Sequence, residues 1–176
     1  VVTGICNEPT GVVPRMRAGF DSSDPGLDST YYVTDVPLTD AVVYTATYYD
    51  NYDFRSHRFF NELPAGLRAR ATDAKGLVTG SLERVLGTNR FIASMSLYDK
   101  EERPTLTMQT THTPGVMTIV ENEYNIDGTV AVMNNKLMHP TGDHTDSHTY
   151  AYDAAGRLVK ETVSYDGGEA VDVQKL

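Results

Sequence analysis

The sequence predicts an all-β protein, an antiparallel meander of β-hairpins that forms a curved, twisted sheet or part of a β-shell and contains little helix. Three observations support this prediction. The 176 residues include 11 Tyr, 5 Phe and no Trp, and Val and Thr are abundant, which is a composition typical of strands. Asp-Gly and Gly-Gly pairs separate segments of alternating polarity, a strong signal for hairpins. A tyrosine followed by Asp or Asn and a turn also recurs at a regular spacing, as in proteins built from repeated units.

Residues 1–30 are expected to be irregular, because Pro and Gly interrupt them too often for long elements. Asp21, Asp24 and Asp28 lie in this segment, and carboxylate oxygens are suitable ligands for calcium. Because these residues lack the alternating spacing of an EF-hand loop, a solvated, turn-forming loop is the preferred interpretation. The single cysteine, Cys6, excludes an intrachain disulfide. No histidine is near it in the sequence, so we expect no nucleophilic role.

Strands are expected at 31–33 and 41–49, since both segments are rich in β-branched and aromatic residues. Asp50 and Asp53 follow the second strand among tyrosines, a combination that is also found in glycoside hydrolases. Two carboxylates so close in sequence cannot be relied on to flank a glycosidic bond, so they are assigned no catalytic role. Residues 64–71 begin with proline and are compatible with either a short helix or a coil with one turn.

Regular strands are expected from residue 77 onward, and about ten to twelve in the whole chain. Residues 91–98 show the clearest pattern, because every second residue is apolar while Ser94 and Ser96 lie on the opposite face. Short polar turns such as Asp166-Gly167-Gly168 join the later strands. The strands expected in this part of the chain are 77–86, 91–98, 104–112, 116–124, 129–137, 147–152, 158–165 and 169–173.

The most distinctive feature is the segment Tyr152–Leu158, with the sequence YDAAGRL. Degenerate copies begin at Tyr98 and Tyr124, so the three tyrosines are 26 and 28 residues apart, and Tyr49-Asp50 is a more distant relative. Each copy is expected to end a strand and to begin a tight turn. The residues assigned to these turns are Tyr98, Asp99, Tyr124, Asn125, Gly128, Tyr152, Asp153, Gly156 and Arg157.

Each residue type of this unit has a structural explanation. The tyrosine ring packs while its hydroxyl reaches solvent or a backbone group, Asp closes the turn through backbone N–H groups, and Gly adopts the left-handed conformation. The arginine is expected to pair with an Asp of an adjacent repeat. Glu102 replaces Gly in the first copy, so that turn is expected to be altered or strained. Asn125 and Thr129 replace Asp and Arg in the second copy, which removes an arginine-mediated tie there.

A histidine cluster is the one arrangement that suggests an enzyme. His139, His144 and His148 lie close together with Asp143 among them, and imidazole and carboxylate groups are ligands for zinc or non-haem iron. The segment 139–148 contains Pro and Gly, so it is expected to be a hairpin loop whose ends bring His139 and His148 together. The spacing matches no helical histidine motif, and solvated loop histidines are the preferred interpretation. We therefore assign no metal or other cofactor.

The overall charge limits the partners of the chain. A net charge of −9 and a pI near 4.9 argue against a nucleic-acid or anionic-membrane partner, since either needs a basic face. No apolar run is long enough to span a bilayer, so no membrane insertion is expected. The sequence also contains no Gly-rich phosphate loop, Ser nucleophile elbow or Cys/His pair, and an enzyme is therefore not expected.

Tyr152–Leu158 resembles the YD-repeat pattern of Rhs, wall-associated and teneurin-like proteins. Residues 76–89 and 97–99 are similar to the region that precedes the repeats in Rhs-type proteins of gut and environmental bacteria, so the resemblance covers roughly residues 75–165. It implies a large secreted or surface-displayed protein whose repeats form a spiralling β-sheet shell. Such shells can enclose a C-terminal toxin or serve adhesion. The conserved core segment and variable tip of those toxins have no counterpart here, so the toxin function is not carried over.

The sequence therefore predicts a non-enzymatic structural or interaction module of a secreted or cell-surface bacterial YD-repeat protein. Its expected regions are an irregular and β N-terminal part, 1–75, and a YD-repeat hairpin part, 76–176, with the alternative that the hairpin part forms one continuous domain with the preceding strands. The expected partners are neighbouring repeats of the parent chain and a glycan or surface protein that contacts a Tyr-rich sheet face. If the chain is a fragment, a long unpaired edge strand is expected near its C-terminus. The alternative hypothesis is a carbohydrate-active or metal-dependent hydrolase that uses His139, His144 and His148.

Overall fold

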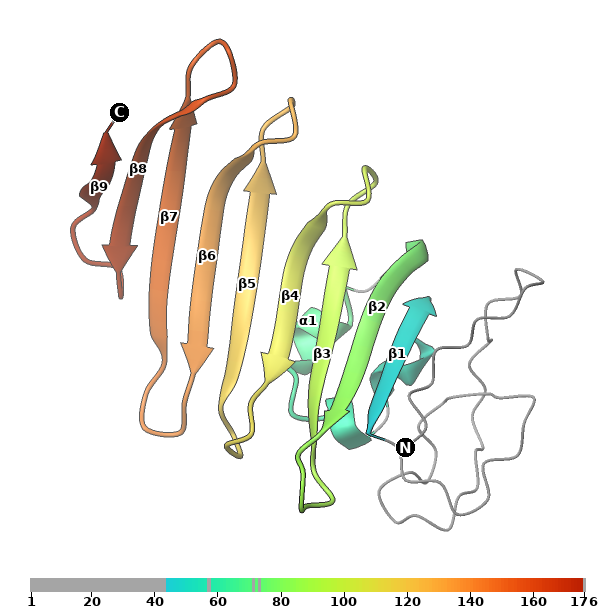
Figure 1. Cartoon of the computed structure of the whole chain (residues 1–176). Helices are drawn as coiled ribbons and strands as arrows, with labels where there is room; N and C mark the ends of the chain where they lie inside the picture. The colour runs from blue at the N-terminus through green and yellow to red at the C-terminus, as the bar shows by residue number, and fades with distance from the viewer. Residues whose placement is uncertain (1–43, 57, 71, 73, 176) are drawn as a thin grey trace. The chain divides into compact units, whose positions relative to one another are not determined.

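The structure is a computed structural model that describes residues 44–56, 58–70, 72 and 74–175. Within these residues, nine strands form an antiparallel meander in which neighbours in the sheet are also neighbours along the chain (Figure 1). The predicted all-β hairpin meander with little helix is therefore confirmed. The strand expected at 31–33, the acidic loop of the first thirty residues and Cys6 lie outside the described residues.

The chain consists of two compact units, Val1–Met95 and Ser96–Leu176. The first unit contains β1 (Thr45–Asp50), β2 (Ala74–Arg84) and most of β3 (Phe91–Tyr98). The boundary expected from the sequence, between residues 75 and 76, falls inside β2. Because β2 pairs with β1 from Ala74 onward, that position lies within one continuous strand pair.

A segment with three short helices connects β1 to β2 in place of a tight turn. These helices are η1 (Asp53–Ser56), η2 (Arg58–Phe60) and α1 (Ala65–Arg68). The segment expected to be either helix or coil at 64–71 thus contains one helical turn, preceded by Pro64 with a φ of −56°. The sequence did not predict the two 3₁₀ helices. No helix in the described part of the chain is long and apolar enough to span a bilayer.

The connecting segment provides aromatic side chains to the core of the first unit. Tyr48 of β1 stacks on Phe54 with ring centroids 4.4 Å apart, and Phe60 lies 4.7 Å from Phe54. These three side chains are fully buried, and Tyr52 and Leu63 are nearly so. Each buried side chain of this size contributes roughly 1.5–3 kcal/mol relative to an exposed one. The segment is therefore held against the sheet by its own aromatic residues.

The second unit contains the end of β3 and six further strands joined by short turns. These strands are β4 (Pro104–Thr110), β5 (Met117–Tyr124), β6 (Val130–Met138), β7 (His144–Tyr152), β8 (Leu158–Tyr165) and β9 (Val171–Lys175). The predicted bounds agree within two residues for all of them except β7, which begins at His144 instead of Ser147. The last strand in the sheet order, β9, is a short one of five residues.

Strict alternation along β3 places one side of the strand in the core. Its odd-numbered residues, including Phe91 and Leu97, are buried, and the residues between them are half-buried, as predicted. The same alternation continues in the second unit, where Leu106, Met108 and Thr110 of β4 are buried. The buried apolar residues of β4 and β5 are Leu106, Met108, Met117 and Ile119.

Candidate functional site

Three turns of the second unit, each following a Tyr-Asp or Tyr-Asn pair, have the same backbone hydrogen bonds. In each, the N–H of the Asp or Asn donates to the carbonyl four residues later, at 2.8–3.0 Å. These pairs are Asp99–Arg103, Asn125–Thr129 and Asp153–Arg157. In each, the N–H three residues after the Asp or Asn also donates back to its carbonyl. The two degenerate copies thus form the same turn as the complete one, and we call the three segments the Tyr-Asp turns.

The position that requires a left-handed conformation is the same in all three Tyr-Asp turns. Gly128 and Gly156 have φ values of 89° and 77°, and Glu102 has a φ of 64°. A glutamate in this region of φ is disfavoured because its Cβ approaches the backbone. The turn that carries Glu102 therefore keeps the shared hydrogen bonds but is strained, as the sequence predicted.

The acidic side chain closes the turn in the way the sequence predicted. One oxygen of Asp153 accepts hydrogen bonds from the backbone N–H groups of Ala155 and Arg157, both at 2.9 Å. The Arg157 guanidinium also donates to the second oxygen of Asp153, at 2.8 Å. The backbone bond from Arg157, followed by this guanidinium bond, holds the pKa of the Asp153 carboxyl below its ordinary value. Burial alone would raise the pKa of Asp99, but equivalent bonds from Arg103 and Glu101 outweigh burial and lower it.

The arginines of the turns bind the Asp of their own turn, so the expected pairing with an Asp of an adjacent repeat is wrong. Arg103 pairs with Asp99 and Arg157 pairs with Asp153, each at 2.7 Å. The spacing of four residues across the closed turn brings each pair together before any neighbouring unit is reached. Arg103 also contacts the next turn, because its guanidinium lies 4.5 Å above the Tyr124 ring. That contact is to an aromatic ring and not to a carboxylate.

The tyrosine hydroxyls connect one Tyr-Asp turn to the preceding one. The hydroxyl of Tyr124 donates to the carbonyl of Pro104, and that of Tyr152 donates to the carbonyl of Val130, both at 2.9 Å. Pro104 and Val130 each lie six residues after the tyrosine of their own turn, so the two acceptors are equivalent atoms. We call these two contacts the tyrosine bonds. They use the polar end of a side chain whose ring packs on the sheet.

Tyr49-Asp50, the more distant relative, does not form a Tyr-Asp turn. Asp50 has a positive φ of 69°, and its carboxylate accepts a 2.6 Å hydrogen bond from the N–H of Gly76, far along the chain. The chain continues into the helical connection instead of returning at once. Asp50 therefore acts at the start of that connection.

The three histidines of the predicted cluster bind separate partners. His139 contacts the Thr141 hydroxyl at 2.6 Å, and His144 contacts Asp166 at 3.2 Å. His148 lies in the middle of β7 opposite Met133, so the expected loop from 139 to 148 that would join His139 to His148 is wrong. The physical reason is that β7 pairs with β6 as early as His144, which shortens the loop. Asp143 forms an ion pair with Lys136 at 2.8 Å, and the hydrogen bond from Lys136 lowers its pKa.

His144 and His148 lie on one strand and are separated by four residues. A strand rises about 3.3 Å per residue, so the two positions are roughly 13 Å apart. They therefore cannot share one ion. Among the residues that the structure describes, no group of three or more His, Cys, Asp or Glu side chains is arranged to hold a metal.

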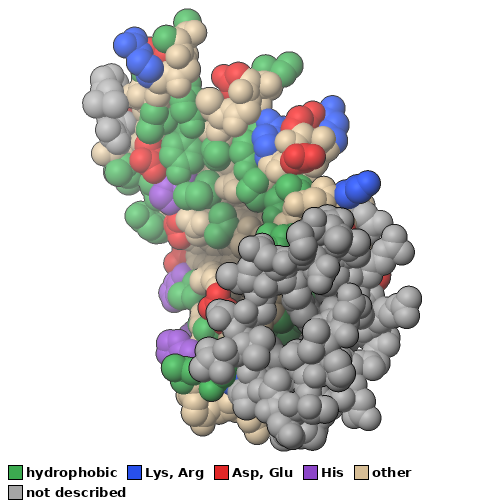
Figure 2. Space-filling model, turned by 45° about the vertical axis from the view of Figure 1, so that its right-hand side comes forward, with side chains coloured by type: hydrophobic (Ala, Val, Ile, Leu, Met, Phe, Trp, Pro, Cys, Tyr) green, Lys and Arg blue, Asp and Glu red, His purple; other side chains and the backbone are tan. Residues whose placement is uncertain are grey.

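The surroundings of His148 contain a residue that the sequence did not single out. Its two ring nitrogens contact Asp146 and Glu161, both at 2.8 Å. Glu161 lies on β8 directly opposite Tyr150, beyond a register shift between Ala151 and Tyr152. Counting residues outward from the third Tyr-Asp turn would have placed Glu161 opposite Thr149, on the other face, so no signal in the sequence pointed to it; the register shift brings it to the face of His148. In Figure 2, acidic and histidine side chains are interleaved with hydrophobic ones on one side of the molecule.

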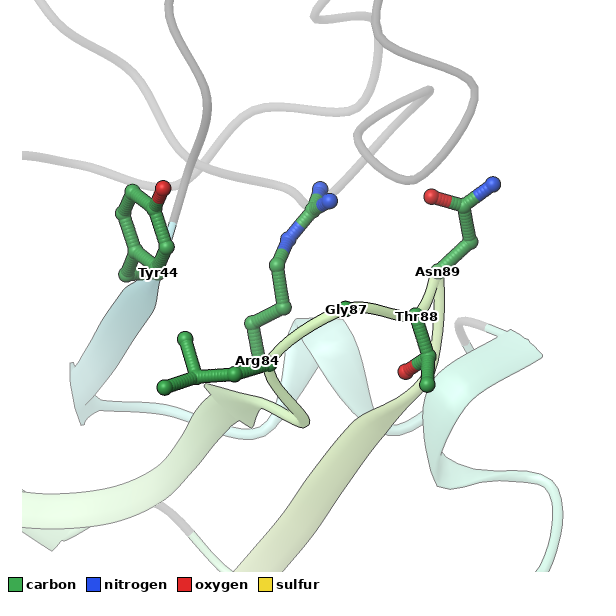
Figure 3. Close-up of a pocket in the computed structure, with 6 residues that line it drawn as sticks. Tyr44, Arg84, Gly87, Thr88 and Asn89 are labelled. Carbon is green, nitrogen blue, oxygen red and sulfur yellow. The ribbon is translucent and has the colours of Figure 1, made fainter.

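A shallow pocket of about 500 Å³ lies at one end of the first unit. Figure 3 shows the side chains of Tyr44, Arg84 and Asn89 extending to the same side of the strands. The Arg84 guanidinium also lies 5.1 Å from the centre of the Phe91 ring. The residues that line the pocket are Tyr44, Arg84, Leu86, Gly87, Thr88 and Asn89. Among the lining residues that the structure describes, Arg84 is the charged one, it is also part of a packing contact, and no acid–base pair is present.

No protein-family model, no curated protein and no solved structure matches this chain.

Proposed function

We propose that this chain is a non-enzymatic structural and interaction module of a secreted or cell-surface YD-repeat (Rhs-like) protein. In this proposal, strand pairs are repeated units that stack on one another through their turns. The observation that carries the proposal is the pair of tyrosine bonds, Tyr124 to Pro104 and Tyr152 to Val130, which join equivalent atoms of successive units at the same distance.

The chemistry of the Tyr-Asp turns supports a structural role. The carboxylate of Asp153 accepts two backbone N–H groups and the guanidinium of Arg157, and the hydroxyl of Tyr152 donates to a backbone carbonyl. Groups engaged in this way are not available to activate a substrate. The hydrolase alternative gains no support, since His139, His144 and His148 bind separate partners.

A contact with a glycan or a protein is supported by the polar and aromatic side chains that share one face of β5–β8. The pairing register places these half-buried residues on the same side of the strands. They are Asn122, Asn135, Asp146, His148, Tyr150 and Glu161. Amide and carboxylate groups beside an aromatic ring suit a partner that offers both hydroxyl groups and apolar surface.

Deletion of one whole unit tests the repeated-unit part of the proposal. Removal of residues 125–152 joins Tyr124 directly to Asp153, keeps a complete Tyr-Asp turn and leaves the direction of every later strand unchanged. We expect this variant to keep a β-type circular dichroism spectrum and to unfold cooperatively, at a lower Tm because the sheet has fewer strands.

The matched control removes residues 125–138, which takes away β6 alone and reverses the direction of every later strand. We expect the control to lose cooperative unfolding. Equal behaviour of the two deletions would contradict the repeated-unit part. A glycoside-hydrolysing activity of the full chain that His148→Gln abolishes would contradict the non-enzymatic part.

A further inference from the structure

The side chains around His148 join three neighbouring strands of the second unit. His148 on β7 contacts Glu161 on β8 at 2.8 Å and Asp146 on its own strand at 2.8 Å. The same Asp146 oxygen accepts a 2.7 Å hydrogen bond from the side-chain amide of Asn135 on β6. We call these four residues the histidine tie. Glu161 is separated from His148 by the third Tyr-Asp turn, so the contact forms only when the β7–β8 hairpin is closed.

The geometry of the histidine tie favours a protonated imidazole. A neutral imidazole has one N–H, and its other ring nitrogen only accepts hydrogen bonds. Both nitrogens of His148 face carboxylate oxygens, which also accept only, so the neutral ring can satisfy one carboxylate and is opposed by the other. The imidazolium form donates to both and neutralises part of their charge.

Among the described residues that face His148 from β6, β7 and β8, none supplies a positive charge that could replace that of the imidazolium. The side chains that flank the ring in the pairing register of β6, β7 and β8 are Met133, Asn135, Asp146, Tyr150, Glu161 and Val163. The ring lies 6.1 Å from that of Tyr150, nearly parallel to it. The side chains of His148 and Glu161 are only 19% and 20% exposed, so solvent screens their interaction incompletely.

We propose that the histidine tie is a pH-dependent lock on the β6–β7–β8 part of the sheet, closed while His148 is protonated and weakened when it loses its proton. The lock acts through the strand pairing that it bridges, and it stands independently of the proposed function. It would tighten this part of the sheet in mildly acidic surroundings and relax it in alkaline ones.

The expected pH range follows from the direction of the pKa shift. Burial alone would lower the pKa of His148, but the hydrogen bonds and charges of Glu161 and Asp146 outweigh burial and raise it above the ordinary value of 6.5. A group whose pKa is raised in the folded state contributes its full stability at any pH below its pKa in the unfolded state. That stability is lost as the pH rises through its pKa in the folded state. The lock therefore opens above pH 6.5.

The test compares the full chain with His148→Gln by urea unfolding between pH 5 and pH 9. We expect the unfolding equilibrium of the wild type to shift toward the unfolded state as the pH rises above 6.5, about tenfold for each unit by which the pKa is raised. His148→Gln should lack this shift. The matched control is His144→Gln, since His144 and Asp166 form a more exposed pair, with side chains 70% and 56% exposed. The control should keep the wild-type dependence.

A histidine-ring NMR titration of the wild-type protein provides a second measurement that does not depend on any variant folding. We expect His148 to titrate above 6.5, and Glu161→Gln to lower its midpoint. A wild-type midpoint at or below 6.5 would overturn the proposal, as would parallel stability profiles of the wild type and His148→Gln.

Discussion

Residue identity at one backbone position determines how much backbone strain each Tyr-Asp turn carries. The third residue after the Asp or Asn has a positive φ in all three turns, and only the first turn places a residue other than glycine there, Glu102. A left-handed conformation costs such a residue about 1–2 kcal/mol. Glycine avoids this cost but loses roughly 0.5–1 kcal/mol more conformational entropy on folding. The difference favours glycine.

Glu102→Gly is therefore expected to stabilise the second unit by about 0.5–1 kcal/mol. The matched control is Glu101→Gly in the same turn, where φ is not positive, so glycine brings the entropy loss and also removes the ion pairs of Glu101 with Arg103 and Lys100. Urea unfolding should show an increased free energy of unfolding for the first variant and a decreased one for the second. A destabilised Glu102→Gly protein would show that the turn is not strained.

At the scale of elements, the helical connection between β1 and β2 packs against the sheet where β2 has no side chain. A Cβ at Gly80 would lie 2.5 Å from the Phe54 ring and 2.9 Å from the Ser94 carbonyl. The fully buried Phe54 ring therefore occupies the space that a side chain at this position would need. One glycine in a strand thus determines where the connection docks.

Gly80→Ala is expected to destabilise the first unit by about 1–3 kcal/mol, because the Phe54 ring must move out of its site. Gly66→Ala in α1 is the matched control, since nothing lies within 4 Å of a Cβ there. It should be neutral or stabilising by up to roughly 1 kcal/mol. Thermal unfolding with a tyrosine fluorescence readout can compare the two. Equal Tm values would show that the ring does not occupy that space.

At the scale of the whole molecule, the stability of the described fold depends on ionised carboxylates that accept hydrogen bonds. Five of them have a pKa below the ordinary 3.8, because N–H, hydroxyl or ammonium groups bind the charged form. They are Asp99, Asp127, Asp143, Asp153 and Asp166. A carboxylate whose pKa is lowered in the folded state contributes stability at any pH above its pKa in the unfolded state. That stability is lost as the pH falls through its pKa in the folded state.

Acid is therefore expected to unfold the protein below about pH 4, because protonation of these carboxylates becomes favourable in the unfolded state near their ordinary pKa. Far-UV circular dichroism between pH 2 and pH 6 would follow the transition. Asp153→Asn keeps a side-chain acceptor but cannot be protonated, so its stability should fall less steeply with acid than that of the wild type. An unchanged slope would show that Asp153 does not contribute to acid unfolding.

Much of the fold could be predicted because its connections are local. The bounds of β8 and the strain at Glu102 were both predicted, since each depends on residues close together in the chain. The start of β7 was missed, because Pro and Gly near His139 suggested a longer loop than the pairing with β6 allows. The partners of the histidines were missed for the same reason, since a contact such as His148 to Glu161 depends on register across a hairpin.

The sequence by itself determined the all-β meander, the order of its hairpins and the conformation of the Tyr-Asp turns. Alternation and turn preference act between residues a few positions apart, so they can be detected without a structure. Only the tertiary structure decided that Phe54 fills the space beside Gly80, that Tyr152 binds Val130 and that His148 lies between two carboxylates. These contacts join residues that meet only after the strands have paired in one register, and a shift of one residue would turn each side chain to the other face.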